Sequence, residues 1–208
     1  APRKIFCLKR GDELCGVIVY CYPPIACFGR RQVLPKMSIK ELNQKLSIIS
    51  RVVVHPKYRT IGLGSKLVRE TLSLAGTPYV EMVAVMAKYN PFGEKAGMQK
   101  IAEQPPSKKA LKIATVLEEL GFNIQLSGSE KYVLNKLETL KAEDITRIKE
   151  AFIQNKTPRF MKYFFPHMPY GKQKLYNKKL MKASLERLAH LIKVCGLLLQ
   201  TKVYLFWR

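Results

Sequence analysis

The segment from Ile49 to Val68 runs from an apolar strand through a basic, glycine-containing turn into a helix. The valines at positions 52 to 54 predict a buried strand, and Pro56 ends it. Apolar residues then recur at helical spacing from Leu63 to Leu72. A helix that starts directly after a turn points backbone N–H groups and the positive end of its dipole at that turn. This segment therefore predicts an α/β fold with an anion-binding turn.

The turn itself reads Arg59-Thr-Ile-Gly62-Leu-Gly64. It has neither the spacing of a phosphate-binding P-loop nor the third glycine of the dinucleotide fingerprint. Its order resembles the Arg/Gln-x-x-Gly-x-Gly/Ala signature of the GNAT superfamily of N-acetyltransferases, which grip the pyrophosphate of acetyl-coenzyme A. In that family the preceding strand splays from its neighbour and offers backbone groups to the pantetheine arm. A glycine-containing turn of another α/β domain is the alternative interpretation.

A second stretch, after an apolar strand expected from Tyr79 to Met86, strengthens the resemblance. Glu94-Lys-Ala-Gly-Met98 matches the end of the family string Tyr-Glu-Lys-x-Gly-Phe, although Gly93 stands at the usual tyrosine position. The resemblance implies an α/β (α+β) fold with a mixed, mostly antiparallel twisted sheet flanked by helices, and acetyl-CoA as cofactor. The cofactor-binding residues that it implies are Val52, Val53, Val54, Arg59, Thr60, Ile61, Gly62, Leu63, Gly64, Ser65, Asn90 and Phe92.

Acetyl transfer to an amine needs a base for the amine and a proton for the departing thiolate. Glu81, an acid within an apolar strand, is the candidate base, and an outward-facing strand residue is the alternative. Tyr89 is the candidate acid, because the tyrosine position of the family is glycine here. His55 is a further titratable candidate beside the cofactor strand, with a structural role as the alternative. Direct transfer in a ternary complex is expected, since no cysteine lies in a Cys-His arrangement.

The formal net charge of +22 predicts a polyanionic partner, with RNA first. A lysine-rich solubilising surface is the alternative. Aromatic and basic residues interleave from Lys156 to Lys172, as in proteins that hold single strands. We expect Phe160, Phe164 and Phe165 to be core residues rather than stacking platforms. The candidate nucleic-acid-binding residues are Arg159, Lys162, Lys172, Lys174, Lys178 and Lys179.

Two regions are expected. Residues 1–126 would form the acetyltransferase core, without the family's usual N-terminal elements, and residues 127–208 a mainly helical, basic C-terminal region. Helices are predicted over 142–154 and 172–199, and a last strand over 201–207. Archaeal proteins that fuse an ABC-type ATPase to a predicted acetyltransferase are similar at Tyr89–Phe92, Glu94–Met98 and Pro105–Lys108. The ATPase would belong to a longer parent chain, since no Walker motif occurs here.

The sequence thus predicts an acetyl-CoA-dependent N-acetyltransferase that transfers directly to an amine of an RNA, such as tRNA, or of another polyanion. A catalytically silent module that binds coenzyme A or nucleic acid, and a protein lysine acetyltransferase, are the alternatives. The five cysteines include no Cys-x-x-Cys pair, so neither a metal site nor a disulfide framework is expected. We expect a cytoplasmic protein without a membrane partner, because no apolar run is long enough to span a bilayer.

Overall fold

The computed structural model describes residues 1–208 except 86, 88 and 166–172. It divides the chain into two compact units. The sheet unit comprises residues 1–104 and 201–208, and the helical unit comprises residues 105–200. The fold class is α+β, as the sequence predicts.

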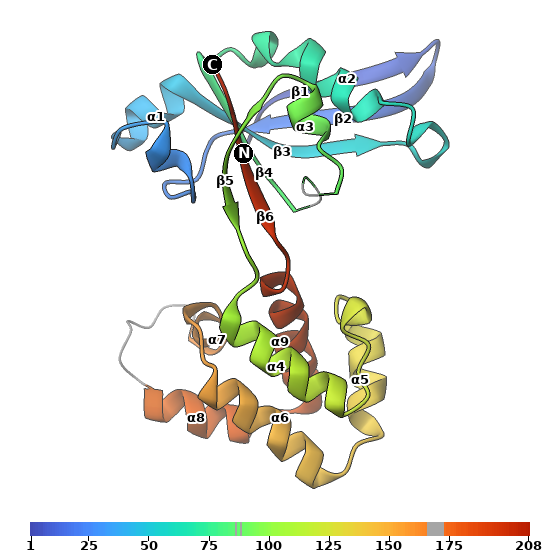
Figure 1. Ribbon diagram of the computed structural model, residues 1–208, viewed down its shortest axis with the longest axis vertical. Coiled ribbons are helices and arrows are strands. Elements are labelled where there is room, and N and C mark those ends of the chain that lie inside the picture. Colours follow the sequence, from blue (N-terminus) through green and yellow to red (C-terminus); the bar gives the residue numbers. More distant parts are fainter. Residues whose placement is uncertain (86, 88, 166–172) are drawn as a thin grey trace. The chain divides into compact units, whose positions relative to one another are not determined.

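The sheet unit is built on an open, mixed sheet of six strands in the order β1-β2-β3-β4-β6-β5 (Figure 1). β3 and β4 are parallel, whereas the other neighbouring pairs are antiparallel. The strands are β1 (Pro2–Arg10), β2 (Glu13–Cys21), β3 (Leu46–Val54), β4 (Tyr79–Ala84), β5 (Gln99–Gln104) and β6 (Lys202–Trp207). The sheet is therefore mostly antiparallel, with one parallel step at its centre.

The described part of the sheet unit has the α-helices α1 (Ile39–Lys45), α2 (Leu63–Thr71) and α3 (Phe92–Lys95). Ser38 caps α1 in a capping box with Glu41. The predicted apolar face of α2 is confirmed, because Leu67 and Val68 are buried in the same core cluster as Ile18 of β2. Packing of this face holds the turn before α2 against the sheet.

β6 lies between β4 and the edge strand β5, and its residues Val203 to Phe206 are buried. Val203 and Leu205 join the core beneath α2, while Tyr204 and Phe206 join a second cluster on the opposite face. This period of two is that of a strand covered on both sides. Each large apolar side chain so buried stabilises the sheet by roughly 1.5–3 kcal/mol.

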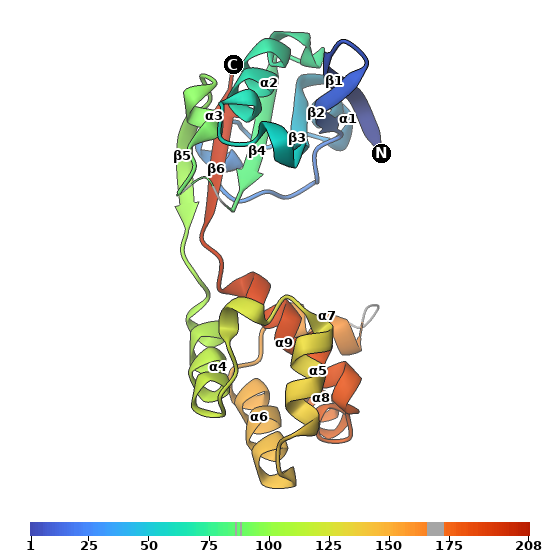
Figure 2. The same cartoon turned by 90° about the vertical axis from the view of Figure 1, so that its right-hand side faces the viewer.

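The helical unit has its own core, to which Ile113, Leu117, Ile148, Phe152 and Leu188 contribute. Within it, α4 packs on α6 and α9, and α5 packs on α9 (Figure 2). Its helices are α4 (Lys108–Glu119), α5 (Glu130–Glu138), α6 (Ala142–Gln154), α7 (Pro158–Phe164), α8 (Gln173–Met181) and α9 (Leu185–Leu198). The predicted helix over 142–154 is confirmed as α6.

The prediction of one helix over 172–199 is wrong, because α8 ends at Met181 and α9 begins at Leu185. Ser184, in an extended conformation, lies at the N-cap of α9. On α4, Ala110 and Ile113 are buried, whereas Leu111 is 47% exposed. The chain leaves this helix through Gly121, which has a φ of 78°.

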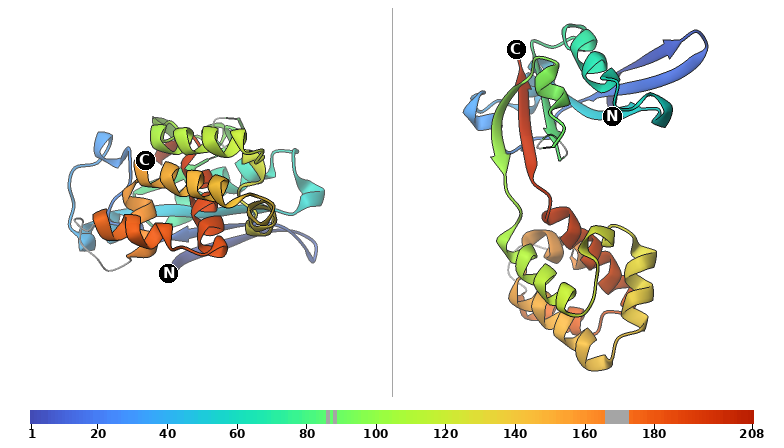
Figure 3. Two further views of the ribbon diagram at one scale, coloured as in Figure 1. Left: turned by 90° about the horizontal axis from the view of Figure 1, so that it is seen from below. Right: turned by 45° about the vertical axis from the view of Figure 1, so that its right-hand side comes forward.

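The structure divides the chain elsewhere than the expected boundary at residue 126. α4 lies in the helical unit, and β6 returns to the sheet, where it pairs with β4 and β5 (Figure 3). The predicted last strand is thus confirmed, but β5 was missed, since Gln99–Gln104 is mostly polar. The helical segment is therefore an insertion between two paired strands rather than a C-terminal extension.

Candidate functional site

β3 and β4 separate at their carboxyl ends (Figure 1). They pair only from Leu46 to Ile49 and from Tyr79 to Met82. Beyond these pairs, β3 continues along β2, whereas β4 continues along β6. In the described residues, the facing edges of β3 and β4 thus carry no further ladder bonds. Backbone N–H and C=O groups along such an edge are free for an extended ligand.

The valines at the end of β3 are less buried than the sequence predicts. They form a strand, as expected, but Val53 is 53% exposed. Val52 and Val54 are partly buried and pack against the core cluster beneath α2. The expectation of a fully buried strand is wrong because only one face of β3 is covered at this end.

The turn after β3 is fixed to β2. The backbone N–H of His55 donates to the Cys15 carbonyl (2.9 Å), and its Nδ1 accepts from the Lys57 N–H (3.3 Å). Tyr58 is buried, and its hydroxyl donates to the Glu13 carboxylate. His55 therefore caps a short 3-10 turn, as its structural alternative predicts, although its ring remains exposed.

The next residues bring the chain into α2 through two left-handed conformations, at Thr60 (φ 71°) and Gly62 (φ 86°). Arg59 is exposed and its Nε donates to the Val54 carbonyl (3.2 Å). Gly62 occupies the N-cap of α2, where no side chain caps the helix. The first N–H groups of α2 therefore face the turn without a side-chain cap at the N-cap.

Three of the implied cofactor-binding residues meet at this point. A Cβ built on Gly64 would lie 4.0 Å from the side chains of both Val54 and Phe92. These residues come from β3, the first turn of α2 and α3, so the fold brings separate segments to one place. Of the remaining residues, Ile61 is 67% exposed, Leu63 and Ser65 are partly buried, and Asn90 is exposed.

α2 is held in place from both sides. Its buried Thr71 hydroxyl shares a hydrogen bond of 2.7 Å with Tyr20 of β2. Arg69 donates to the Lys95 carbonyl (2.7 Å), which ties α2 to the end of α3. The N-terminus of α2 is therefore set on a rigid support beside the separated strands.

Glu81 is fully buried and forms two hydrogen bonds with Arg30, from Nε to Oε2 (2.9 Å) and from Nη2 to Oε1 (2.6 Å). The Tyr204 hydroxyl donates to the same carboxylate (2.9 Å). Arg30 also donates to the carbonyls of Pro24 and Ile25. The alternative that Glu81 faces solvent is wrong, and the carboxylate anchors a loop to the sheet in this structure.

Burial and the Glu81 charge set the ionisation of the neighbouring groups. Burial first, and then Glu81, raises the pKa of the Cys27 thiol to about 11. The same two causes, in the same order, raise the pKa of Tyr204. Burial is the largest single effect on the pKa of Arg30 and would lower it, but the hydrogen bonds and the charge of Glu81, with contributions from Cys27 and Tyr204, together raise it. The cluster is therefore an ion pair surrounded by neutral groups.

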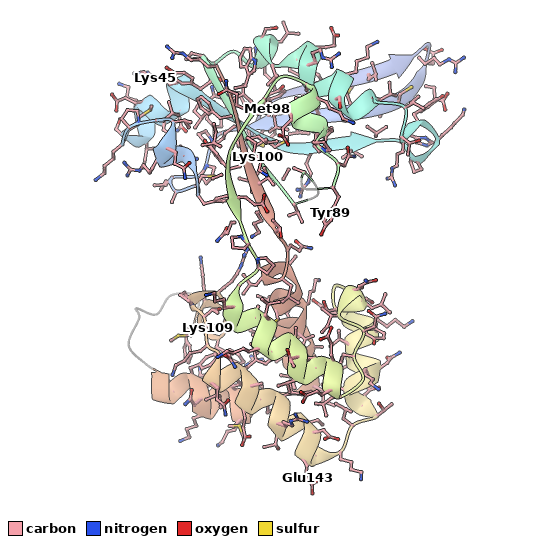
Figure 4. All side chains as sticks on the ribbon, viewed as in Figure 1. Lys45, Tyr89, Met98, Lys100, Lys109 and Glu143 are labelled. Carbon is pink, nitrogen blue, oxygen red and sulfur yellow. The ribbon has the colours of Figure 1, made fainter. Side chains whose placement is uncertain are left out.

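Tyr89 is 78% exposed and precedes α3, with its side chain extending away from the ribbon (Figure 4). Gly93, at the family's tyrosine position, faces the core instead. A Cβ there would lie 2.6 Å from Met82 and 2.7 Å from Leu205. No larger side chain fits at position 93 without displacing them, whereas the Tyr89 hydroxyl is accessible.

Among the basic candidates, Arg159 and Lys162 of α7 and Lys178 and Lys179 of α8 are exposed. Lys174 lies in α8, and Lys172 lies outside the described residues. Phe160, Phe164 and Phe165 are buried in the helical core, so their predicted core role is confirmed.

Sequence reasoning missed Arg30 and Tyr204 as partners of Glu81. A buried carboxylate costs several kcal/mol unless it is paired, so an acid inside an apolar strand signals that partners exist. This signal does not identify the partner residues, because Arg30 is 51 residues and Tyr204 is 123 residues from Glu81 along the chain. The pairing of β4 with β6 brings Tyr204 beside Glu81, and the loop between β2 and α1 brings Arg30 to both.

Comparison of the chain with protein-family models, with curated proteins and with solved structures found no match. None of the helices that the structure describes has the length and apolar character needed to cross a membrane.

Proposed function

We propose that the chain is an acetyl-CoA-dependent N-acetyltransferase of the GNAT type. The single observation that carries the proposal is the separation of parallel β3 and β4 directly beside the glycine turn and the N-terminus of α2. An extended pantetheine arm suits the unpaired strand edges, and a pyrophosphate suits the N–H groups of α2.

The residues at the turn fit such a coenzyme. The nearest side-chain atoms to a Cβ at Gly64 are 4.0 Å away, so backbone is accessible there, and Arg59 adds an exposed positive charge. Val53, Ile61 and Phe92 offer apolar surface nearby. Acetyl-CoA, when bound, would supply the acyl thioester.

The chain's own groups would move the protons. The Tyr89 hydroxyl is proposed as the acid that protonates the departing thiolate, because it is exposed near α3. The acceptor amine loses its proton to a base; Glu81 and His55 stay predictions for that role. Glu81 is fully buried and paired, so an aqueous path would be needed to reach it. Transfer is proposed to be direct.

The acceptor is proposed to be a polyanion, with RNA first, because a net charge of +22 repels basic protein tails and free amines. A cytoplasmic location, and an ABC-type ATPase region in a longer parent chain, are part of the same proposal.

A silent module that binds the coenzyme without turnover is the second candidate. The buried Glu81–Arg30 pair favours it, since the carboxylate expected as base is engaged in the fold. Gly93 favours it too, because the position faces the core.

Incubation of the chain with labelled acetyl-CoA and total cellular RNA and protein tests the proposal. Label in the RNA fraction supports it, whereas label in protein supports lysine acetylation. Saturable coenzyme binding without label in either fraction supports the silent module. Tyr89→Phe should lower kcat by about 10²-fold or more without changing coenzyme affinity; unchanged turnover would remove Tyr89 from the mechanism.

A further inference from the structure

Positive charge is distributed unevenly in the helical unit. Residues 151–185 include eight Lys and Arg and no Asp or Glu. Elsewhere in the unit, acidic residues accompany the basic ones, and some of them pair: Arg147 pairs with Glu119, and Lys193 lies 3.0 Å from Glu130. The acid-free segment therefore has most of the excess positive charge of this unit.

The exposed charges of this segment lie on two helices that pack together. α7 contacts α8, and the Phe164 and Tyr176 rings meet at 5.7 Å. We define the α7–α8 basic cluster as Arg159, Lys162, Lys178, Lys179 and Lys182, all exposed. No salt bridge reaches these five from the residues that the structure describes.

The backbone that carries the cluster is firmly held. Lys149 donates to the carbonyls of Met181 (2.9 Å) and Ala183 (3.0 Å), which fixes the end of α8. The Lys179 ammonium lies 4.5 Å from the centre of the Phe165 ring. The charges are therefore presented from an ordered surface rather than from a loose tail.

Stacking platforms are absent from the described part of this unit. Every Phe and Tyr there is buried or partly buried, and the rings beside the cluster belong to the core. Proteins that hold single strands depend on exposed rings for about 1–3 kcal/mol per base. The described part of this surface offers charges without exposed rings, which favours the partner of highest charge density, and a double helix carries one charge per roughly 1.7 Å.

We propose that the α7–α8 basic cluster binds the phosphate backbone of a double-helical nucleic acid without reading its bases. This inference rests on the proposed function and specifies its acceptor. The nucleic acid is a double helix held through its phosphates, not a single strand held by stacking of its bases. Binding is measured without coenzyme, so its failure is distinct from a failure of acetyl transfer.

The test titrates the full chain into a fluorescent RNA duplex of about 20 base pairs, a DNA duplex and a single strand of equal length. About five phosphate contacts predict that log K falls with log salt at a slope of about −4 to −5 for the RNA duplex. Arg159→Glu with Lys162→Glu and Lys178→Glu should weaken duplex binding about 30-fold or more and flatten that slope by about 3.

The matched control reverses three exposed lysines elsewhere in the unit, with Lys112→Glu, Lys131→Glu and Lys141→Glu. It makes the same change in net charge and should weaken binding about threefold or less. Circular dichroism checks that both variants fold. Equal losses in the two variants would overturn the proposal, as would tighter binding of the single strand than of both duplexes. Selective loss of binding to phosphatidylserine vesicles, with duplex binding intact, would assign the cluster to a membrane surface instead.

Discussion

At the scale of single residues, substitution within the buried Glu81–Arg30 pair should lower the free energy of unfolding strongly. Removing one partner leaves the other charge buried and unpaired, which typically costs about 3–5 kcal/mol. Arg30 would also keep its bonds to the Pro24 and Ile25 carbonyls without a counter-charge. The pair is therefore expected to be coupled rather than additive.

Glu81→Leu alone and Arg30→Met alone should each lower the free energy of unfolding by about 3–5 kcal/mol, and the double variant should lose less than the sum. Denaturant unfolding followed by the fluorescence of Trp207, the chain's one tryptophan and a residue of β6, measures the change in the sheet unit. Tyr204→Phe serves as a milder control. Additive losses would show that the two charges do not depend on each other.

Two thiols, the partly buried Cys27 and the buried Cys195, make stability depend on pH. Burial raises the pKa of Cys27 to about 11 and that of Cys195 to about 12, from an ordinary value of 9.0. Below pH 9 both thiols are protonated in the folded and unfolded chain, and their contribution to stability is fully present. Above pH 9 the unfolded chain releases these protons first, so stability falls as pH rises toward 11 and 12.

Unfolding measured from pH 8 to pH 11 should therefore show a decline that is smaller in Cys195→Ala than in the parent chain. The substitution lowers stability at every pH through lost packing, so the slope and not the absolute value is compared. An identical slope in both proteins would mean that Cys195 titrates alike in the folded and unfolded states.

At the scale of elements, the strand, turn and helix from β3 to α2 are predictable from local pattern. The valine run, Pro56 and the spacing of Leu67 and Val68 all act within a few residues. The separation of β3 from β4 is not predictable in this way, since it depends on β6 pairing with β4. The exposure of Val53 follows from how the finished sheet is covered, and so it was missed.

The substitutions Gly62→Ala and Gly64→Ala should change the stability of the protein in different ways. Gly62→Ala places a Cβ on a residue with φ 86° and should cost about 1–2 kcal/mol of stability. Gly64→Ala meets nothing closer than 4.0 Å and lies in a helix, so stability should hold or rise by up to about 1 kcal/mol.

Coenzyme affinity, in contrast, should fall more in Gly64→Ala than in Gly62→Ala. Gly64→Ala adds a methyl group where a pyrophosphate would approach the backbone, so acetyl-CoA affinity should fall about tenfold or more. Thermal unfolding and equilibrium binding of both variants give the comparison. Undiminished acetyl-CoA binding by Gly64→Ala would remove the first turn of α2 from the proposed site.

At the scale of the whole molecule, the helical unit is inserted between β5 and β6. This insertion explains why the predicted boundary at residue 126 differs from the boundaries between the two units. α4 has a sequence that suits either unit, and only its packing on α6 and α9 assigns it. The polar β5 is an edge strand, which weakens its apolar signal. Local pattern predicted α6 and β6, but the pairing of β6 with β4 is nonlocal.

Gln104 pairs with Lys202, so the two connections to the helical unit leave the sheet unit side by side. Replacing residues 105–201 with Asn-Gly should therefore close a two-residue hairpin and leave the sheet unit folded. Residues 105–200 alone should give a helical circular dichroism spectrum and a cooperative melt, because their core is self-contained. A molten spectrum from either piece would show that the units stabilise each other.

Titration calorimetry of the full chain with acetyl-CoA tests the central claim most directly. The proposed site predicts saturable one-to-one binding that Arg59→Glu weakens about tenfold or more, since the substitution reverses a charge beside the pyrophosphate. Lys40→Glu, on α1 before the opposite end of β3, makes the same change in charge and should leave affinity within about twofold. Absence of saturable binding, or equal loss in both variants, would contradict a coenzyme site at the separated ends of β3 and β4.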